Sequence, residues 1–487
     1  MILHLLDIPY SQSIILFRII SKQKTKGLFM MQTANQDRSF LGTEPIGKLL
    51  LKMALPTVAA QLINMLYNII DRVYIGHIPG NGALALTGVG VCMPLIMIVS
   101  AFAALVGNGG APRATIYMGK NDPETAEKIL GNCFGLQIIV SVILTVVLLL
   151  FNRSLLLAFG ASENTISFAV DYMNIYALGT LFVQLTLGMN AFITAQGFAK
   201  EGMLSVLIGA IANIILDPIF IFALGMGVKG AALATIISQG ASCIWVVSFL
   251  FGKRTSLRIK PQNMRLMPSI FLPCLALGSA IFIMQASESV ISVCFNSSLL
   301  KYGGDVAVGA MTILTSVMQF TMLPLQGLGQ GAQPIISYNY GARNTDRVKA
   351  GFWLLLKVSL IYSTISWVCV MCFPQLFAAM FTSDAVLAAF TKTAMRIYFA
   401  VSLIFGIQVA CQMTFNSLGN AKASIVVAVM RKFVLLIPLI FLMPHLYTAD
   451  RTLAVYMAEP VADFIAVTFT SILFAFQFKK ALRQIAS

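Results

Sequence analysis

The chain has 487 residues, of which 58% are hydrophobic and only 10% are charged. A soluble globular protein carries about 25% charged residues, and a disordered chain carries more charge with far fewer apolar residues, so the composition excludes both classes. The 33 lysines and arginines outnumber the 18 aspartates and glutamates, but no interleaved aromatic residues accompany them, so the net charge of +15 does not indicate a nucleic-acid partner.

The first 45 residues lack the long apolar blocks of the rest of the chain. Residues 11–20 are too few and too polar to span a bilayer, and no small-residue cleavage site follows them, so a signal peptide is not predicted. We expect residues 1–45 to form a cytoplasmic N-terminal segment. Met31 is an alternative native start, in which case residues 1–30 would not belong to the protein.

Long apolar blocks without charge follow, for example at residues 82–112 and 230–252. About 20 such residues span a bilayer as a helix, and the blocks lack the alternation of a membrane β-barrel. Breaks of glycine, proline, asparagine and charge divide the chain into twelve candidate spans, at residues 46–76, 83–116, 125–151, 165–196, 202–224, 229–252, 269–300, 305–338, 348–373, 387–418, 423–446 and 452–478. We therefore predict an all-α membrane protein with twelve transmembrane helices.

The two halves of the chain repeat each other. Pro334 follows Pro112 by 222 residues, and Tyr398 follows Tyr176 by the same offset. Each half holds six spans, so the copies point the same way, and a pseudo-two-fold axis along the membrane normal is expected. The predicted organisation is a six-helix lobe at residues 46–252, a cytoplasmic linker at 253–268, and a second six-helix lobe with a short tail at 269–487. Parallel repeats around a cavity are typical of an alternating-access carrier.

Lysine and arginine fall mainly in the loops on one side of the predicted helices. With the N-terminus inside, nineteen of them lie in inner segments and four in outer segments. The positive-inside rule then predicts that both termini are cytoplasmic, in a bacterial inner membrane.

The sequence contains few residues that could act in catalysis or bind a cofactor. The eight cysteines lie inside apolar blocks without a disulfide or metal spacing, and there are only three histidines. We expect no enzymatic activity and no cofactor.

The first span carries a polar stripe that ends in a carboxylate. Four of its residues fall within about 80° of arc on one helix face, namely Gln61, Asn64, Asn68 and Asp71. The seventh span carries a similar polar stripe, formed by Gln285, Glu288, Ser292 and Asn296. A carboxylate at membrane depth is costly and usually marks an ion or substrate path. The alternatives are that these residues only join helices, or that Arg72 pairs with Asp71.

The fifth and sixth spans add further oxygen ligands. Asn213 and Asp217 are four residues apart and share a helix face, and Thr235 lies on the next span. Carboxylate and amide oxygens suit a hard cation or a shared proton, although a buried aspartate held by an asparagine would also explain the pair. Pro56 interrupts the first span and is interpreted as a hinge or as a static kink.

Other polar residues fall into two groups. Tyr176, Gln184 and Gln412 are predicted to face a central substrate cavity together with the polar stripes. The second group consists of charged residues on the last two spans that could pair as a structural network or as a second coupling site, namely Arg431, Lys432, Glu459 and Asp463.

Several of these motifs occur together in one known family. They are the segment at residues 66–77, Pro56 fifteen residues before Asp71, the turn from Gly109 to Pro112 with its repeat at residues 331–334, and Asn213 with Asp217. The sequence resembles the multidrug and toxic compound extrusion (MATE) family, most closely its MepA-like bacterial branch, over about 440 residues from Ile46 onward. The resemblance implies two six-helix lobes and the efflux of organic, often cationic, drugs coupled to inward flow of H⁺ or Na⁺.

The resemblance also assigns residues. Asp71, Asn213, Asp217 and Thr235 correspond to the cation site of the first lobe, which could hold Na⁺, and Pro56 corresponds to a proline at which the helix bends. Glu288 matches a carboxylate that some members use in the other lobe. Members that bind Na⁺ in the second lobe carry an aspartate on the tenth span, and near the corresponding place this chain has Ile407 and Gln408, which favours the site in the first lobe.

The expected function is therefore secondary active export by antiport. We expect a monomer in the lipid bilayer that moves small organic cations outward, with H⁺ or Na⁺ as the coupling ion and no other cofactor. Two alternatives remain. A flippase for a lipid-linked precursor would be expected to show fourteen spans or a basic central cavity, and an exporter of one specific metabolite would share the fold.

Overall fold

Helices account for nearly all of the chain that the computed structural model describes, which is residues 40–382 and 384–486. No strand occurs in those two ranges. Most of the predicted N-terminal segment, including the question of the start at Met31, lies outside the described residues. The predicted boundaries of the helices agree with the structure to within a few residues, apart from longer ends.

The first half of the chain begins with a short helix and continues with six spans. These elements are α2 (Phe40–Thr43), α3 (Ile46–Gly76), α4 (Gly82–Gly119), α5 (Pro123–Ala158), α6 (Ile166–Leu178) with α7 (Thr180–Ala195), α8 (Ala199–Pro218) with a π-helical turn (Ile219–Ala223), and α9 (Gly227–Phe251). Asp122 caps α5 by accepting a hydrogen bond from the Thr125 backbone N–H, at 3.0 Å.

The second half has the same sequence of spans. They are α10 (Pro268–Gly341), α11 (Thr345–Cys372), α12 (Pro374–Ala379), α13 (Ala385–Tyr398) with α14 (Phe405–Ser417), α15 (Ala421–Val429) with a π-helical turn (Met430–Leu436) and α16 (Ile437–Leu446), and α17 (Arg451–Ala486).

The count of twelve spans follows from three features of these helices. Nine of the described helices are long and apolar enough to cross a membrane, and two pairs bent by 59° and 49° raise the number to eleven. The last feature is α10, whose 74 residues are two helices joined at Gly304, where φ is 64° and ψ is −160°. Only glycine adopts that backbone conformation easily. The predicted twelve-helix fold is confirmed.

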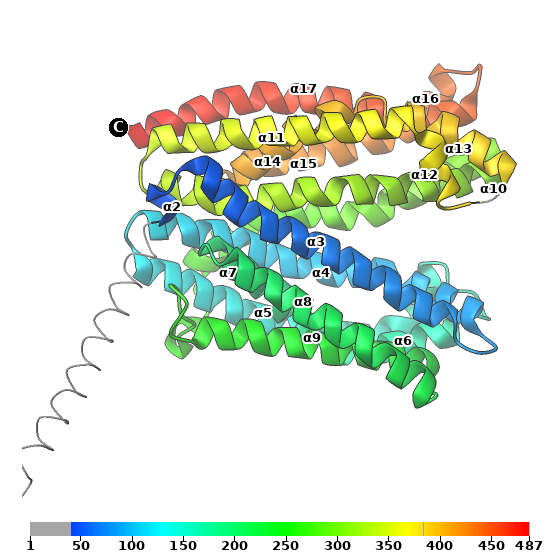
Figure 1. The fold of residues 1–487 in the computed structure, drawn as a ribbon, viewed down its shortest axis with the longest axis horizontal. Helices are drawn as coiled ribbons and strands as arrows, with labels where there is room; N and C mark the ends of the chain where they lie inside the picture. Colours follow the sequence, from blue (N-terminus) through cyan, green and yellow to red (C-terminus); the bar gives the residue numbers. More distant parts are fainter. Residues whose placement is uncertain (1–39, 383, 487) are drawn as a thin grey trace, which may run out of the picture.

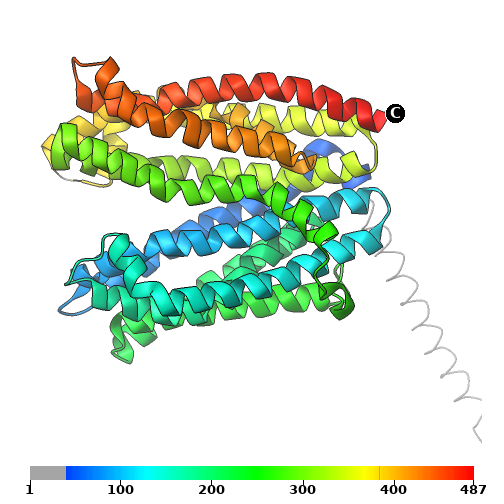
Figure 2. The same cartoon turned by 180° about the vertical axis from the view of Figure 1, so that it is seen from behind.

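The helices gather into two groups in both views of the molecule, α3 to α9 in one and α10 to α17 in the other (Figures 1 and 2). We call them the first and the second lobe. The fourth span is the bent one in each lobe. The turn that follows it contains a glycine with positive φ, Gly197 in the first lobe and Gly419 in the second, 222 residues apart. The repeat inferred from the sequence therefore extends to backbone geometry.

The lobes touch most closely near the end of the molecule that holds α2 and the end of α17 (Figure 1), which we call the α2 end. A side chain at Gly109 or Gly278 would collide with the backbone carbonyl of Cys274 or Leu105 across the interface. Nearer that end, Gly119 and Gly341 face opposing carbonyls in the same way. Bare glycine backbones thus let α4 and α10 approach directly, as small residues do between membrane helices.

The helix α3 is continuous from Ile46 to Gly76 with Pro56 inside it, so the proline does not end the helix in this conformation, and its role as a hinge or a static kink stays a prediction. The proline is buried where the lobes meet, beside Thr57, whose hydroxyl donates to the Gly327 carbonyl of the second lobe at 2.7 Å. The same hydroxyl lies within hydrogen-bond distance of the Met53 and Ala54 carbonyls. Threonine hydroxyls and neighbouring helices can satisfy the backbone groups that a proline leaves unpaired in a membrane helix.

Candidate functional site

Two carboxyl groups of the first lobe lie side by side within the membrane-spanning region. Asp71 of α3 and Asp217 of α8 are within hydrogen-bond reach of each other. One turn before Asp217 on the same face, the Asn213 side-chain amide donates to Asp217 Oδ1 at 3.1 Å. Asp217 is fully buried and Asn213 is 2% exposed. The structure therefore brings together three of the four residues predicted for the cation site.

Thr235 belongs to the same cluster through a tyrosine that the sequence analysis did not assign to it. The Thr235 side chain on α9 lies close to Tyr172 on α6. A second tyrosine, Tyr67, precedes Asp71 by one helical turn and lines the same pocket as Gln239 of α9. The i, i+4 spacing from Tyr67 to Asp71 was a signal that the sequence analysis missed. The site thus draws on α3, α6, α8 and α9.

Three oxygen atoms of this cluster are buried without a hydrogen-bond partner, namely Asp71 Oδ1, Asp217 Oδ2 and Asn213 Oδ1. Buried polar atoms nearly always have a partner. Two carboxylates this close also repel each other when both are ionised. The arrangement therefore suits a shared proton or one hard cation such as Na⁺, which oxygen ligands prefer.

Two alternatives for this site can be judged from its geometry. Asp71 makes no ion pair with Arg72 among the described residues, and the Arg72 side chain is exposed, so that pairing is not the role of Asp71. The described residues also contain no group of three His, Cys, Asp or Glu side chains that could hold a metal. A Na⁺ ion would need amide and hydroxyl oxygens in addition to the two carboxylates.

A pocket adjoins the carboxyl pair inside the first lobe. Its empty volume is about 390 Å³ including the opening. The lining residues come from α3, α7, α8 and α9, and are Asn64, Tyr67, Thr186, Leu187, Val206, Gly209, Ala210, Asn213, Thr235, Ser238, Gln239 and Ser242. Asn64 was predicted to line a substrate cavity, and the pocket that it lines lies within one lobe.

Two other residues of the polar stripe on α3, Gln61 and Asn68, form hydrogen bonds outside the carboxyl pair. The Gln61 amide donates to the Gln330 amide oxygen of the second lobe at 3.1 Å, so Gln61 links the lobes. The Asn68 amide donates to the Asn64 backbone carbonyl at 2.6 Å, one turn earlier on its own helix. Gln285, in the matching stripe of the second lobe, is exposed.

Three predicted cavity residues lie inside the lobes instead. Tyr176 is 3% exposed and stacks on Tyr172. Gln184 is fully buried and donates to the Val99 carbonyl at 2.6 Å, and Gln412 donates to Ser424 Oγ at 2.7 Å. The prediction that these residues face a central cavity is wrong for this conformation, because all three side chains are buried. The amides of Gln184 and Gln412 join neighbouring helices of one lobe, the common use of amides in membrane proteins.

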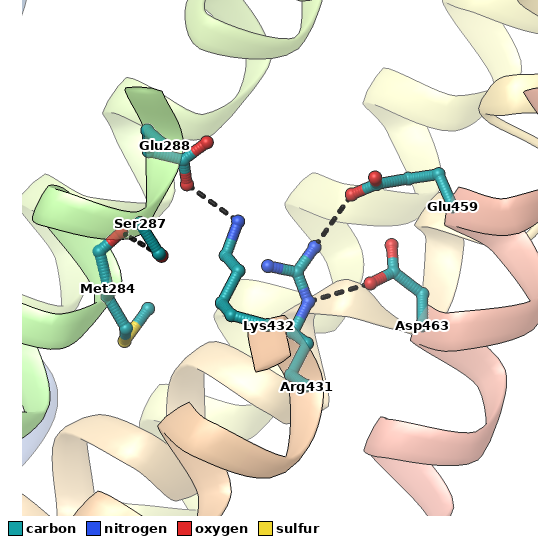
Figure 3. A network of polar contacts seen from close by, with 7 residues as sticks. All are labelled: Met284, Ser287, Glu288, Arg431, Lys432, Glu459 and Asp463. Atoms are coloured by element: carbon teal, nitrogen blue, oxygen red, sulfur yellow. Dashed lines mark hydrogen bonds and ion pairs between the residues drawn. The ribbon is translucent and has the colours of Figure 1, made fainter. Parts of the chain in front are cut away.

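The second lobe contains a network of five charged side chains (Figure 3). Arg431 contacts Glu459 at 3.0 Å and Asp463 at 2.7 Å, as the sequence predicted. Lys432 contacts Glu288 of α10 at 2.6 Å, so its predicted pairing with α17 is wrong. The two cations are adjacent in the π-helical turn, and Figure 3 shows them directed toward different helices.

Burial separates Glu288 from the rest of this network. Its side chain is 50% exposed, whereas the side chains of Lys432, Arg431, Glu459 and Asp463 are only 5% or 6% exposed. Arg431 also lies over the Phe405 ring, 4.7 Å from its centroid. Three carboxylates therefore face two cations, and Glu288 is the member through which the network is open to its surroundings.

The chain was compared with known proteins. The MatE family model matches residues 56–219 and again residues 280–442, which is more than half of the chain. The chain is similar to the multidrug export protein MepA of Staphylococcus haemolyticus (strain JCSC1435), with 24% identity over 426 residues, 87% of this chain and 92% of the relative. It is 23% identical over 410 residues to MepA of Staphylococcus aureus (strain N315), covering 83% of this chain and 88% of that one.

Solved structures match the fold. A MATE structure in the bent conformation has a TM-score of 0.86 at 22% identity and covers 93% of this chain and 99% of its own. A MOP superfamily transporter from Pyrococcus furiosus has a TM-score of 0.85 at 23% identity, with coverages of 92% and 98%. A multidrug resistance MATE transporter in the outward-facing conformation has a TM-score of 0.85 at 22% identity, with coverages of 91% and 98%.

Proposed function

The chain belongs to the MatE family, and from this premise we propose that it is an antiporter that exports small organic cations against an inward flow of H⁺ or Na⁺. The family and the similarity to MepA multidrug export proteins support the export of small organic compounds. The choice of an antiport mechanism depends on one observation, the buried pair of Asp71 and Asp217 with its unpartnered oxygens.

The coupling ion has to bind differently in the two conformations of the carrier, because otherwise it cannot favour either one. Asp71 is suited to this requirement since α3 connects it directly to the interface between the lobes. Gln61 and Thr57, on the same continuous helix, hydrogen-bond to the second lobe about 15 to 20 Å away along the helix axis. Loss of the negative charge at Asp71 would change the contact of α3 with α8, and α3 would transmit the change to the lobe interface.

The proposed orientation places the α2 end in the cytoplasm. The linker and the α4–α5 and α10–α11 turns lie at that end, and they carry Lys120, Lys260 and Arg343 among other cations. Hydrogen bonds between the lobes, such as Thr57 to Gly327 and Asn416 to Asn108, lie in the half of the molecule nearer to it. We assign this conformation to the outward-facing state, closed on the cytoplasmic side.

The charge network of the second lobe argues against a flippase for a lipid-linked pyrophosphate. Such a carrier would need cations free to bind the cargo, whereas Arg431 and Lys432 are buried and already paired with carboxylates. The half-exposed Glu288 instead presents a negative charge, which is suited to a cationic cargo.

The experiment that tests the function uses the purified chain in liposomes loaded with ethidium, a monocationic dye. Dye efflux is measured under an imposed pH gradient and separately under a Na⁺ gradient, with protein-free liposomes as the control. One gradient is expected to accelerate efflux severalfold over the level without a gradient. Efflux that responds to neither gradient would contradict antiport.

A further inference from the structure

The short helix α2 (Phe40–Thr43) precedes the first span of the first lobe but is packed against the second lobe. Leu41 is 1% exposed and packs with Ile335, Phe352 and Phe415 of the second lobe. The same hydrophobic cluster also includes residues of α3 such as Leu49 and Met53. The backbone of α2 also packs closely there, since Gly42 lies against the Tyr338 ring. Two residues, Glu44 and Pro45, join α2 to α3.

Polar groups of the second lobe bind the carbonyls of Leu41 in α2 and of Glu44 directly after it. Arg347 Nη2 donates to the Glu44 carbonyl at 2.7 Å and to the Leu41 carbonyl at 3.2 Å. The Asn339 amide, fully buried, donates to the same Leu41 carbonyl at 2.9 Å and accepts from Arg347 Nε at 3.0 Å. A helix end leaves its last carbonyls without partners and favours a nearby cation. Arg347 and Asn339 thus satisfy this end of α2 from across the interface.

The other side of α2 is attached to the first lobe. The Phe40 ring packs directly on Gly197, which has a φ of +95° in the turn between α7 and α8, and any side chain at that glycine would collide with the ring. Lys52 of α3 lies over the same ring, 4.4 Å from its centroid, and contacts Glu44 at 3.3 Å. A cation over an aromatic face is attracted by it. Phe40 and Leu41 therefore connect the two lobes through adjacent residues.

We propose that α2 is a latch that holds the lobes together at the α2 end and stabilises the conformation closed on that side. To open that end, the chain has to withdraw Leu41 from the second lobe or Phe40 from the turn at Gly197. The cytoplasmic location of the latch, and hence its effect on transport, depends on the proposed function. The latch itself depends only on the contacts between the lobes.

The test is hydrogen–deuterium exchange of the full chain in lipid nanodiscs, followed by mass spectrometry. Arg347→Ala removes the attachment to the second lobe, and Phe40→Ala removes the attachment to the first. Each is expected to accelerate exchange at residues 40–44, 105–119 and 327–341 by on the order of tenfold, because Arg347→Ala removes hydrogen bonds from a charged donor and Phe40→Ala removes the ring packed on Gly197. The matched control is Lys349→Ala, a nearby exposed cation on α11.

A double variant separates a latch from a local structural role. If the two attachments act in series as one connection between the lobes, losing either of them is enough to release α2. The double variant Arg347→Ala with Phe40→Ala should then show nearly the same exchange rate as the faster of the two single variants. Additive effects, or faster exchange confined to the turn around each substitution, would overturn the proposal. Arg347→Lys, which keeps the charge but loses the paired hydrogen bonds, provides a further variant if Arg347→Ala does not fold.

The outcome can be distinguished from a failure of the proposed function. Exchange needs neither cargo nor a gradient, so a chain that shows the predicted exchange without dye efflux would retain the latch and contradict the antiporter. A chain that exports dye but shows wild-type exchange in both single variants would retain the antiporter and contradict the latch.

Discussion

Lys432 Nζ lies 2.6 Å from Glu288 Oε1, and this ion pair joins α10 to the π-helical turn between α15 and α16. The lysine is buried and the glutamate is half-exposed. Loss of the counter-ion therefore has a larger cost for one partner of this ion pair than for the other. Glu288 without Lys432 still has access to its surroundings, whereas Lys432 without Glu288 would be a buried ammonium beside Arg431, a like charge, in a lobe that offers little solvation.

Removing Glu288 should therefore destabilise the protein more than removing the pair. Glu288→Gln leaves Lys432 without its counter-ion, and we expect a loss of about 1 to 3 kcal/mol, less than for a fully buried pair because Glu288 is half-exposed. The double variant with Lys432→Met should recover most of that loss. The melting temperature in detergent measures both, and a double variant no more stable than Glu288→Gln would contradict the expected dependence.

Substitution of Arg431 should lower the stability of the protein even more, because this side chain neutralises two buried carboxylates. Arg431→Met leaves Glu459 and Asp463 close together without a cation, and a loss of about 3 to 5 kcal/mol is expected. Arg431→Lys should recover only part of it, because an ammonium cannot reproduce the two directed guanidinium contacts. The same thermal unfolding measurement tests the order, and equal stability of the Met and Lys variants would be inconsistent with it.

Asp71 should be essential for coupling. Asp71→Asn mimics the neutral acid at nearly constant volume, so gradient-driven dye efflux should fall to the level of protein-free liposomes while the protein stays folded. Glu288→Gln should weaken efflux less. Asp171→Asn is the matched control, since Asp171 lies in the same lobe in a partly exposed ion pair with Lys229. Efflux by Asp71→Asn at the wild-type rate would refute the assignment and direct attention to Glu288.

The glycine contacts between the lobes should tolerate no side chain. Gly278→Ala places a methyl group against the Leu105 carbonyl, and overpacking of this kind costs about 1 to 3 kcal/mol. Gly47→Ala is the control, since nothing lies within 4 Å of a side chain there. A lower melting temperature is expected for Gly278→Ala alone. An unchanged value would mean that the lobes adjust at no measurable cost.

The orientation can be tested by labelling. A cysteine introduced at Lys260, which is partly exposed in the linker, should not react in intact cells with an impermeant maleimide beyond the level of the parent protein. It should react once the membrane is permeabilised. Reaction in intact cells would reverse the proposed orientation and place the latch outside.

Much of this arrangement could be predicted from the sequence. Apolar blocks and breaker residues were sufficient for twelve helices, and the spacing of Asn213 and Asp217 placed both on one face of a helix. The similar depth of the charged residues on the last two spans also indicated the partners of Arg431 on α17. In each case the information is local, because the helical period fixes which side chains share a face.

The sequence does not predict in the same way what surrounds each face of a helix in the folded protein. A polar side chain on a membrane helix can face its own lobe, the other lobe or lipid, and the period does not distinguish them. Gln184 and Gln412 were therefore placed in a cavity although they bind neighbouring helices. Lys432 could reach a carboxylate on either α10 or α17, and only the packing of the three helices makes Glu288 its partner.

The bare backbone contacts of Gly109, Gly119, Gly278 and Gly341 have a consequence for the membrane itself. A carrier that uses an ion gradient has to prevent ions and water from crossing on their own, since any leak dissipates the gradient. Where backbones meet without intervening side chains, water has no room between them at those contacts. In the conformation described, these glycines would help the α2 end to act as an insulating barrier, which is a requirement that packing for stability alone does not impose.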